Sequence, residues 1–345
     1  MKQAITLVGD GIENPANALT MLHAASMFGA ACRFRDTKNL AHSGLSETPL
    51  FVPITGEEVR TLHGRRIAFD NLPRASEVYG FKAGQDFAVL VGNERRGLSH
   101  EFATLATDRV QVPMISRRIN CLNVAAASAV ALYYLCGTPV GKMAVRSDPA
   151  RRRPDVLLLG PRDHVELGSA IRSATAFGWN RLFVEDRHNV WFDCDRGIRS
   201  EGRAAARRGR NDILLIPCQA KASHAFARVT VITSRQGIPI HRSNLTRGAS
   251  QLVVIPDESE PGLGTEVWSR LGAEVEFACL QIPAAEFTYH YRVIATVALA
   301  EISRQVGRPS IKGPPAPRPP IYDHKLARFA EAAGQWVRLE DLADY

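Results

Sequence analysis

A short apolar strand that runs into a glycine-containing loop is the feature that most constrains the fold of this chain. Residues 87–91 (Phe-Ala-Val-Leu-Val) are all apolar, and the polar loop after them carries Gly92 and Gly97. An apolar run of this length between polar residues is typical of a buried strand. A glycine directly after a strand lets a ligand approach the backbone, because there is no side chain in the way. The pattern predicts a buried strand followed by a ligand-binding loop.

A second loop and a helix follow the strand. Val110-Gln111-Val112-Pro113 leads into a polar segment, and Asn123 then stands directly before a run of small residues at 124–131. Asparagine is a favoured N-cap, because its side-chain oxygen can accept a hydrogen bond from the first turn of a helix. We therefore expect a helix that begins after Asn123.

These segments resemble motifs 2 and 3 of the SpoU branch of the SPOUT methyltransferases. The similar residues are Gly92-Asn93-Glu94-x-x-Gly97-Leu98-Ser99, Val112-Pro113-Met114 and Cys121-Leu122-Asn123-Val124-Ala125-Ala126-Ala127. The resemblance implies an α/β fold with a trefoil knot, in which helices cover both faces of a parallel sheet. It also implies S-adenosylmethionine (AdoMet) as cofactor and methylation of the ribose 2′-oxygen of RNA.

Length and composition set broad limits. A chain of 345 residues suggests two domains, and a net charge of +8 permits an RNA partner without demonstrating one. The six cysteines form no Cys-x-x-Cys pair, which argues against a zinc site or a disulfide framework, and we expect no metal. The sequence has no long apolar run and no signal-peptide pattern, so we expect a cytoplasmic protein without a membrane partner.

Residues 13–30 predict a helix that is similar to SpoU motif 1. Asn14, Asn17 and the pair Phe28-Gly29 match that motif, but His23 stands in place of its arginine. His23 could act as a general base, although a histidine packed in the core or at an interface is the favoured interpretation.

The pattern then starts again in the second half of the chain, at a spacing of about 150 residues. Residues 155–159 predict a strand, and residues 163–178 resemble a second motif 1 that keeps its arginine as Arg172 and has Glu166 in place of an asparagine. The later motifs are eroded: the loop after residues 251–256 lacks the first glycine, and Arg292 stands where the first half has Asn123. Glu166 could contact RNA or pair with Arg172.

We therefore expect two tandem SPOUT-like domains that pack as an internal pseudo-dimer. The expected boundaries are a first SPOUT domain at 1–142, a linker at 143–154, a degenerate SPOUT domain at 155–306, and a proline-rich segment with a tail helix at 307–345. In SpoU enzymes one subunit binds AdoMet and the other supplies the motif 1 arginine. Here the first half would bind AdoMet and the second would supply Arg172, so the chain would work as a monomer with one site.

The resemblance assigns roles to individual residues. The expected catalytic residues are Arg172, Glu94 and Asn123. The expected AdoMet contacts are Leu90, Gly92, Asn93, Gly97, Val112, Met114, Cys121 and Leu122. The expected RNA contacts are Arg199, Arg203, Arg207 and Arg208, within a segment rich in arginine.

Several of these roles stay open. Arginine is normally always protonated, so Arg172 is expected to bind phosphate and to position or acidify the 2′-hydroxyl rather than to accept its proton. Glu94 could bind the nucleotide or only fix the loop, Asn123 could be only a helix cap, and Cys121 could be a small buried side chain.

Three functions fit the sequence, in order of preference. The first is an AdoMet-dependent ribose 2′-O-methyltransferase that acts on tRNA or rRNA. The second is a non-catalytic RNA-binding relative that has lost activity. The third is a SPOUT enzyme that methylates a base, against which the SpoU-like motif 3 argues. Methyl transfer that depends on Arg172 would separate the first two, and nucleoside mass spectrometry would identify the third.

Overall fold

The chain forms two compact units, each built on its own parallel β-sheet. The computed structural model describes residues 4–43, 51–62, 64–70, 74–114, 122–137, 153–192, 213–217, 226–246, 250–257, 274–283, 290–307 and 337–338. The first unit comprises Met1–Pro113, Leu122–Lys142 and Ile282–Val293; the second comprises Met114–Cys121, Met143–Gln281 and Ile294–Tyr345. The sequence predicted segment 114–121 in the first domain and segment 282–293 in the second, whereas the structure groups each of them with the other unit.

Seven strands form the sheet of the first unit, and all of its strand pairs are parallel. The strands are β1 (Ala4–Asp10), β2 (Ala31–Arg35), β3 (Val52–Pro53), β4 (Arg65–Phe69), β5 (Ser76–Glu77), β6 (Asp86–Val91) and β7 (Asp108–Gln111), in the order β3-β2-β1-β6-β4-β7-β5. The predicted strand at 87–91 is confirmed as part of β6, which lies in the centre of the sheet. Its last five residues are all buried, because a parallel sheet is covered on both faces.

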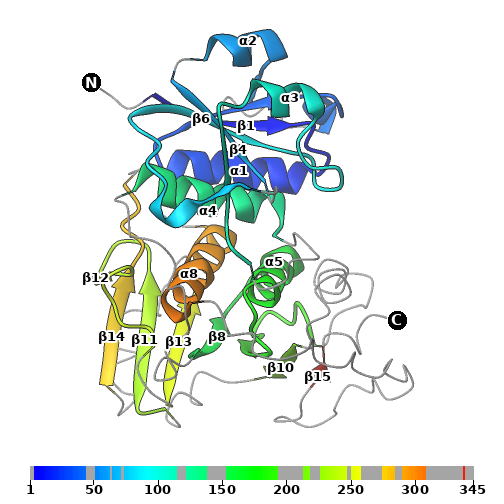
Figure 1. Ribbon diagram of the computed structural model, residues 1–345. Helices are drawn as coiled ribbons and strands as arrows, with labels where there is room; N and C mark the ends of the chain where they lie inside the picture. The colour runs from blue at the N-terminus through cyan, green and yellow to red at the C-terminus, as the bar shows by residue number, and fades with distance from the viewer. Residues whose placement is uncertain are drawn as a thin grey trace, which may run out of the picture. The chain divides into compact units, whose positions relative to one another are not determined.

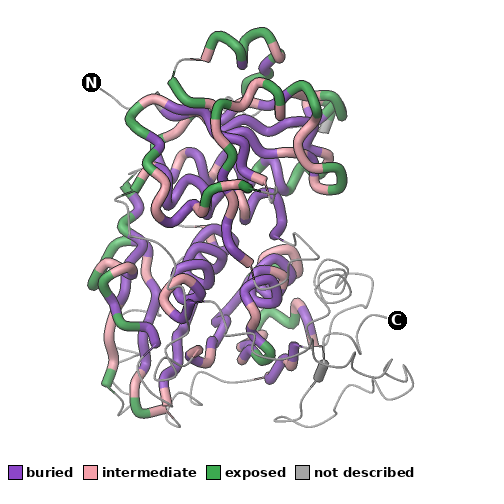
Figure 2. The backbone as a smooth tube through the Cα atoms, in the orientation of Figure 1, coloured by how far each residue is buried: buried purple, intermediate pink, exposed green. Residues whose placement is uncertain are grey.

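Helices cover both faces of this sheet (Figure 1). Helices α2 (Gly56–Thr61) and α3 (His100–Leu105) lie on one face, and α1 (Pro15–Met27) and α4 (Val124–Cys136) lie on the other. The described residues of this unit also include the short 3-10 helices η1 (Leu40–Ser43) and η3 (Val78–Gly80). The central strands and the inner faces of the helices are buried, while α2 is largely exposed (Figure 2).

Local sequence signals explain where α1 and α4 begin and end. Asn14 caps α1 by accepting a hydrogen bond from Ala16 N at 2.9 Å, and Pro15 follows at the first helical position, where its missing N–H costs nothing. The helix stops before Gly29, which has a φ of +68°. Asn123 caps α4 as predicted, since its Oδ1 accepts a hydrogen bond from Ala125 N at 2.9 Å.

The second unit contains an eight-stranded sheet, of which seven strands are parallel. The strands are β8 (Asp155–Leu159), β9 (Arg181–Glu185), β10 (Leu214–Pro217), β11 (Arg228–Thr233), β12 (Ile238–Pro239), β13 (Gln251–Pro256), β14 (Glu274–Cys279) and β15 (Val337–Arg338). Helix α5 (His164–Ala176) and most of α8 (Tyr291–Val306) belong to this unit, and Ser173 Oγ lies 2.9 Å from Thr296 Oγ1 between them.

The two sheets have the same topology. The order β10-β9-β8-β13-β11-β14-β12 corresponds strand for strand to β3-β2-β1-β6-β4-β7-β5. A local turn repeats as well: Asp36 accepts hydrogen bonds from Leu40 N and Ala41 N, and Asp186 accepts them from Val190 N and Trp191 N. This architecture is consistent with two tandem SPOUT-like domains, as the sequence predicted.

Within the tail expected at 307–345, residues Val337–Arg338 form strand β15, which pairs with β10 in an antiparallel direction. The tail helix stays a prediction. The rest of that tail and the linker up to residue 152 lie outside the described residues. Within the described part of the chain, none of the helices combines the length and the apolar character needed to cross a membrane.

Candidate functional site

The loop after β6 folds back on itself, and this explains its two glycines. Asn93 N donates to Gly97 O at 2.9 Å, and Gly97 N donates to Asn93 O at 3.0 Å. A Cβ atom added to Gly92 would lie 2.0 Å from the backbone of Gly97 and Leu98, and Gly97 itself has a φ of +71°. Any larger residue at position 92 would therefore displace backbone, so the loop closes only around a glycine.

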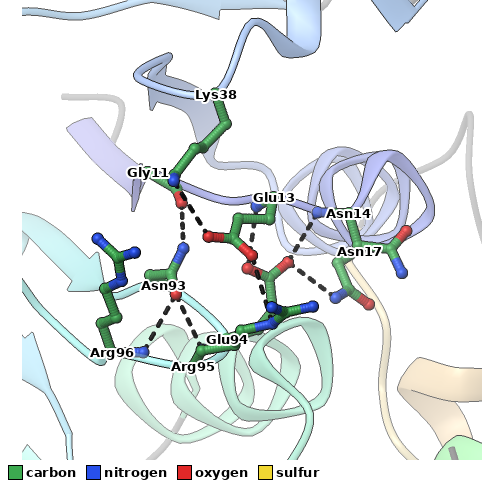
Figure 3. Close-up of polar contacts among 9 residues, drawn as sticks. All are labelled: Gly11, Glu13, Asn14, Asn17, Lys38, Asn93, Glu94, Arg95 and Arg96. Atoms are coloured by element: carbon green, nitrogen blue, oxygen red, sulfur yellow. Dashed lines mark hydrogen bonds and ion pairs between the residues drawn. The ribbon is translucent and has the colours of Figure 1, made fainter.

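Asn93 ties this loop to the end of β1. Its Nδ2 donates to Gly11 O at 2.6 Å, while its Oδ1 accepts hydrogen bonds from Arg95 N at 2.9 Å and Arg96 N at 3.1 Å (Figure 3). The side chain is only 9% exposed. Asn93 thus shapes the loop through both ends of its carboxamide.

Glu94 fastens the same loop to the start of α1. Its Oε2 accepts from Glu13 N at 2.9 Å, and its Oε1 accepts from Asn14 N at 3.1 Å and from Asn17 Nδ2 at 3.0 Å (Figure 3). The N-terminal N–H groups of a helix lack partners within the helix and favour a negative charge. Both carboxylate oxygens are therefore engaged, which favours fixing of the loop over direct contact with a nucleotide.

Asn17 and Asn123 join the two helices behind the loop. Asn123 Nδ2 donates to Asn17 Oδ1 at 2.9 Å, and both side chains are buried. Asn123 thus both caps α4 and contacts α1, the helix that resembles motif 1. The sequence marked Asn17 as part of motif 1 but gave it no role in the site.

A buried carboxylate supports the far end of the loop. Asp10, which is 2% exposed, accepts a hydrogen bond from Ser99 N at 2.8 Å and pairs with Arg35 Nε at 2.9 Å. Arg35 also pairs with Glu101 in α3. Sequence analysis missed Asp10, although a carboxylate at the end of a buried strand is a signal that could have identified it.

Basic side chains surround Glu13 at the exposed side of the site. Lys38 Nζ lies 3.3 Å and Arg95 Nε lies 3.5 Å from its carboxylate. The pKa of Glu13 is lowered, chiefly by a hydrogen bond from Asn93 and then by Lys38. Glu13 therefore stays ionised in this basic surrounding.

The remaining expected site residues fall into three groups. Leu90, Val112 and Leu122 are buried in the first unit, next to the loops that carry the motifs. Met114 is grouped with the second unit, where Arg172 lies half-buried in α5. Outside the described residues lie Cys121, Arg199, Arg203, Arg207 and Arg208.

His23 is packed against another histidine. Its ring centroid lies 5.1 Å from that of His290, which belongs to the same unit, and burial lowers the pKa of His23. The pKa of His290 is lowered to about 3 by burial and then by the neighbouring His23 and Arg292. This packing favours the interpretation of His23 as a core histidine.

The corresponding loop of the second unit is built differently. Asp257 follows β13 where Gly92 follows β6, is 1% exposed, and pairs with Arg162 Nε at 2.7 Å. Glu166 accepts a hydrogen bond from Arg162 N at 2.8 Å, and so caps the turn that Glu94 caps in the first unit. After β13, a buried carboxylate thus stands in place of the glycine. The turn before α5 is capped by Glu166 from α5 itself, whereas Glu94, which caps the turn before α1, comes from the β6 loop.

Glu166 makes the stability of the second unit dependent on pH. Burial, and then the nearby Asp163 and Asp257, raise the pKa of Glu166 to about 7. The folded protein therefore binds the proton of Glu166 more tightly than the unfolded chain does. The stability that Glu166 contributes is fully present below its ordinary pKa of 4.5 and is lost as pH rises through 7. Glu166→Gln should therefore stabilise the chain at pH 8 by up to about 3 kcal/mol, and hardly at pH 4.

Thermal unfolding of the full chain between pH 4 and pH 8 tests this expectation. Glu274→Gln is the matched control, because Glu274 is an exposed carboxylate in the same unit that pairs with Arg228. Parallel stability curves for the wild type and Glu166→Gln would contradict the assignment.

The site geometry agrees with the comparison with known families. Residues 4–133 match the sequence model of the SpoU rRNA Methylase family. The first unit therefore contains a domain similar to this family, which we call the SpoU-type domain. The match ends in α4, so the SpoU-type domain includes the β6 loop, Asn17 and Asn123.

Solved structures of SpoU and TrmH proteins are also similar to this chain. The SpoU methyltransferase AviRb from Streptomyces viridochromogenes, solved in complex with AdoMet, is 24% identical with a TM-score of 0.33, over 39% of this chain and 58% of AviRb. A TrmH-family protein from Porphyromonas gingivalis is 22% identical with a TM-score of 0.31, over 39% and 59% of the two chains. The aligned part thus spans less than two thirds of these proteins. A search of curated proteins found no match.

Proposed function

We propose that the chain is an AdoMet-dependent RNA methyltransferase that modifies the ribose 2′-oxygen of tRNA or rRNA. The proposal rests mainly on one observation: the SpoU-type domain carries a glycine loop that closes on itself at Gly92 and is fastened to α1 by Glu94. A glycine loop at the end of a central parallel strand is a common place for a nucleotide-like ligand.

The residues around this loop fit the cofactor. Gly92 lets the loop close against the backbone of Gly97 and Leu98, and the closed loop would hold the cofactor. Bound AdoMet would supply an electrophilic methyl group on its sulfonium. The proposed contacts are Leu90, Gly92, Asn93, Gly97, Val112, Met114, Cys121 and Leu122. Glu94 and Asn123 would act by holding the loop and α4 in place.

Methyl transfer to a ribose hydroxyl is an in-line displacement, so its main demand is alignment of the reacting atoms. We propose that Arg172 binds a phosphate of the RNA and orients the 2′-hydroxyl, because a guanidinium offers several donors in a fixed plane and keeps its proton. One chain would then hold one composite site and act as a monomer. Arg199, Arg203, Arg207 and Arg208 would bind the RNA backbone.

Two measurements on the full chain test the proposal. Calorimetric titration with AdoMet should give one site per chain, because Asp257 replaces the loop glycine in the second unit. Mass spectrometry of nucleosides from methylated RNA should show 2′-O-methylribose. A methylated base would refute the ribose assignment. If AdoMet does not bind even with RNA present, the chain is a non-catalytic RNA-binding relative.

A further inference from the structure

We propose that Arg292 is a positioning residue of the SpoU-type site, which orients the Asn17 carboxamide and through it the Glu94 carboxylate. This inference rests on the proposed function. The sequence placed Arg292 in a degenerate motif of the second half, but the segment 282–293 belongs to the first unit. The Arg292 side chain donates hydrogen bonds to Ala16, Asn17 and Thr20 of helix α1.

The guanidinium of Arg292 is buried along one face of α1. Its Nη1 donates to Thr20 Oγ1 at 2.8 Å and to Ala16 O at 3.3 Å, and its Nη2 donates to Asn17 Oδ1 at 3.0 Å. Only 3% of the residue is exposed. His23 continues the same helix face, one turn further on, and packs against His290. The segment that carries Arg292 therefore follows the face on which SpoU motif 1 has its arginine.

The contacts of Asn17 leave its amide only one orientation. Asn123 uses its Oδ1 to cap α4, so its Nδ2 must be the group that faces Asn17 Oδ1. Arg292 directs a second donor at the same oxygen. The Asn17 Nδ2 group must then point to the Glu94 carboxylate, which it reaches at 3.0 Å. Without Arg292, Asn17 Oδ1 would lose its charged donor and keep the neutral Nδ2 group of Asn123.

Asn17 also connects two opposite charges. A buried guanidinium needs acceptors for its protons, and here it finds a carbonyl, a hydroxyl and an amide oxygen. Both charges polarise the Asn17 amide, because the cation of Arg292 lies at its oxygen and the anion of Glu94 lies at its nitrogen. Glu94 in turn holds the backbone N–H groups of Glu13 and Asn14. Removal of Arg292 should therefore loosen the turn before α1.

Arg292→Met tests this role in the full chain, and Arg304→Lys is the control. Arg304 lies in the same helix, α8, but pairs with Glu301 in the second unit. By hydrogen–deuterium exchange, the amides at 12–18 should exchange about tenfold faster in Arg292→Met and at the wild-type rate in Arg304→Lys. This readout does not depend on AdoMet. An unchanged rate in Arg292→Met would overturn the proposal.

AdoMet affinity gives the second readout. Arg292→Met should weaken binding roughly tenfold to a hundredfold, because it removes charged hydrogen bonds. In an Asn17→Ala background, Arg292→Met should have almost no further effect on AdoMet affinity. If Arg292→Met acted only through a general loss of stability, its effect would add to that of Asn17→Ala. Additive effects would overturn the proposal. If the wild type itself binds no AdoMet, the proposed function fails, and the exchange experiment still tests Arg292.

Discussion

Gly92→Ala is expected to weaken AdoMet binding by at least about a hundredfold. The added methyl carbon would lie 2.0 Å from the backbone of Gly97 and Leu98, which cannot move aside as the end of a flexible side chain could. The loop would have to open, and overpacking of this kind typically costs about 1–3 kcal/mol of stability as well. Calorimetric titration with AdoMet and thermal unfolding measure the two effects.

Gly84→Ala is the matched control for this substitution. Gly84 has a φ of +92°, and no heavy atom lies within 4 Å of an added Cβ, so its replacement strains only the local backbone. We expect a loss of about 1–2 kcal/mol in stability and no change in AdoMet affinity. If Gly92→Ala binds AdoMet as tightly as the wild type, the β6 loop is not the cofactor site.

Arg172→Ala is expected to reduce methyl transfer by at least about a thousandfold and to leave AdoMet affinity within about twofold. Loss of alignment alone can have an effect of this size, because correct positioning of the reacting atoms can lower the barrier by about 7–11 kcal/mol. Arg172→Lys should restore only part of the rate, since an ammonium lacks the planar fork of a guanidinium. Transfer of a labelled methyl group to RNA and calorimetric titration separate the two quantities.

A mixture of Gly92→Ala and Arg172→Ala chains tests whether the site lies within one chain. If each chain holds one composite site, the mixture stays inactive, because every molecule has one defective part. Restored transfer would show that the site forms between two chains. Light scattering on the active protein should accordingly give the mass of a monomer.

Local signals in the sequence predicted the elements that depend on local physics. The apolar run at 87–91 indicated β6, and Asn123 before small residues indicated the start of α4. The repeat of these signals indicated two α/β units of the same kind, and the strand orders agree with it. These features could be predicted because burial, capping and turns leave short patterns.

The contacts that shape the site could not be predicted in this way. Glu94 binds backbone N–H groups 80 and 81 residues away, and Arg292 binds α1 across more than 270 residues. No local pattern fixes which distant acceptor such a side chain reaches. The sequence left open whether Glu94 and Asn123 contact the ligand or only support the loop and the helix, and their contacts favour support.

The repeated topology has a consequence for how such a protein can change. The two sheets share one strand order and the Asp36 and Asp186 turns, yet their loops differ at Gly92 and Asp257. A protein assembled from two identical copies must carry every substitution twice, so a change that improves one side is imposed on the other. A single chain that contains two different units is free of that symmetry. It can keep the framework of both units and adapt each loop independently to a substrate with no twofold axis.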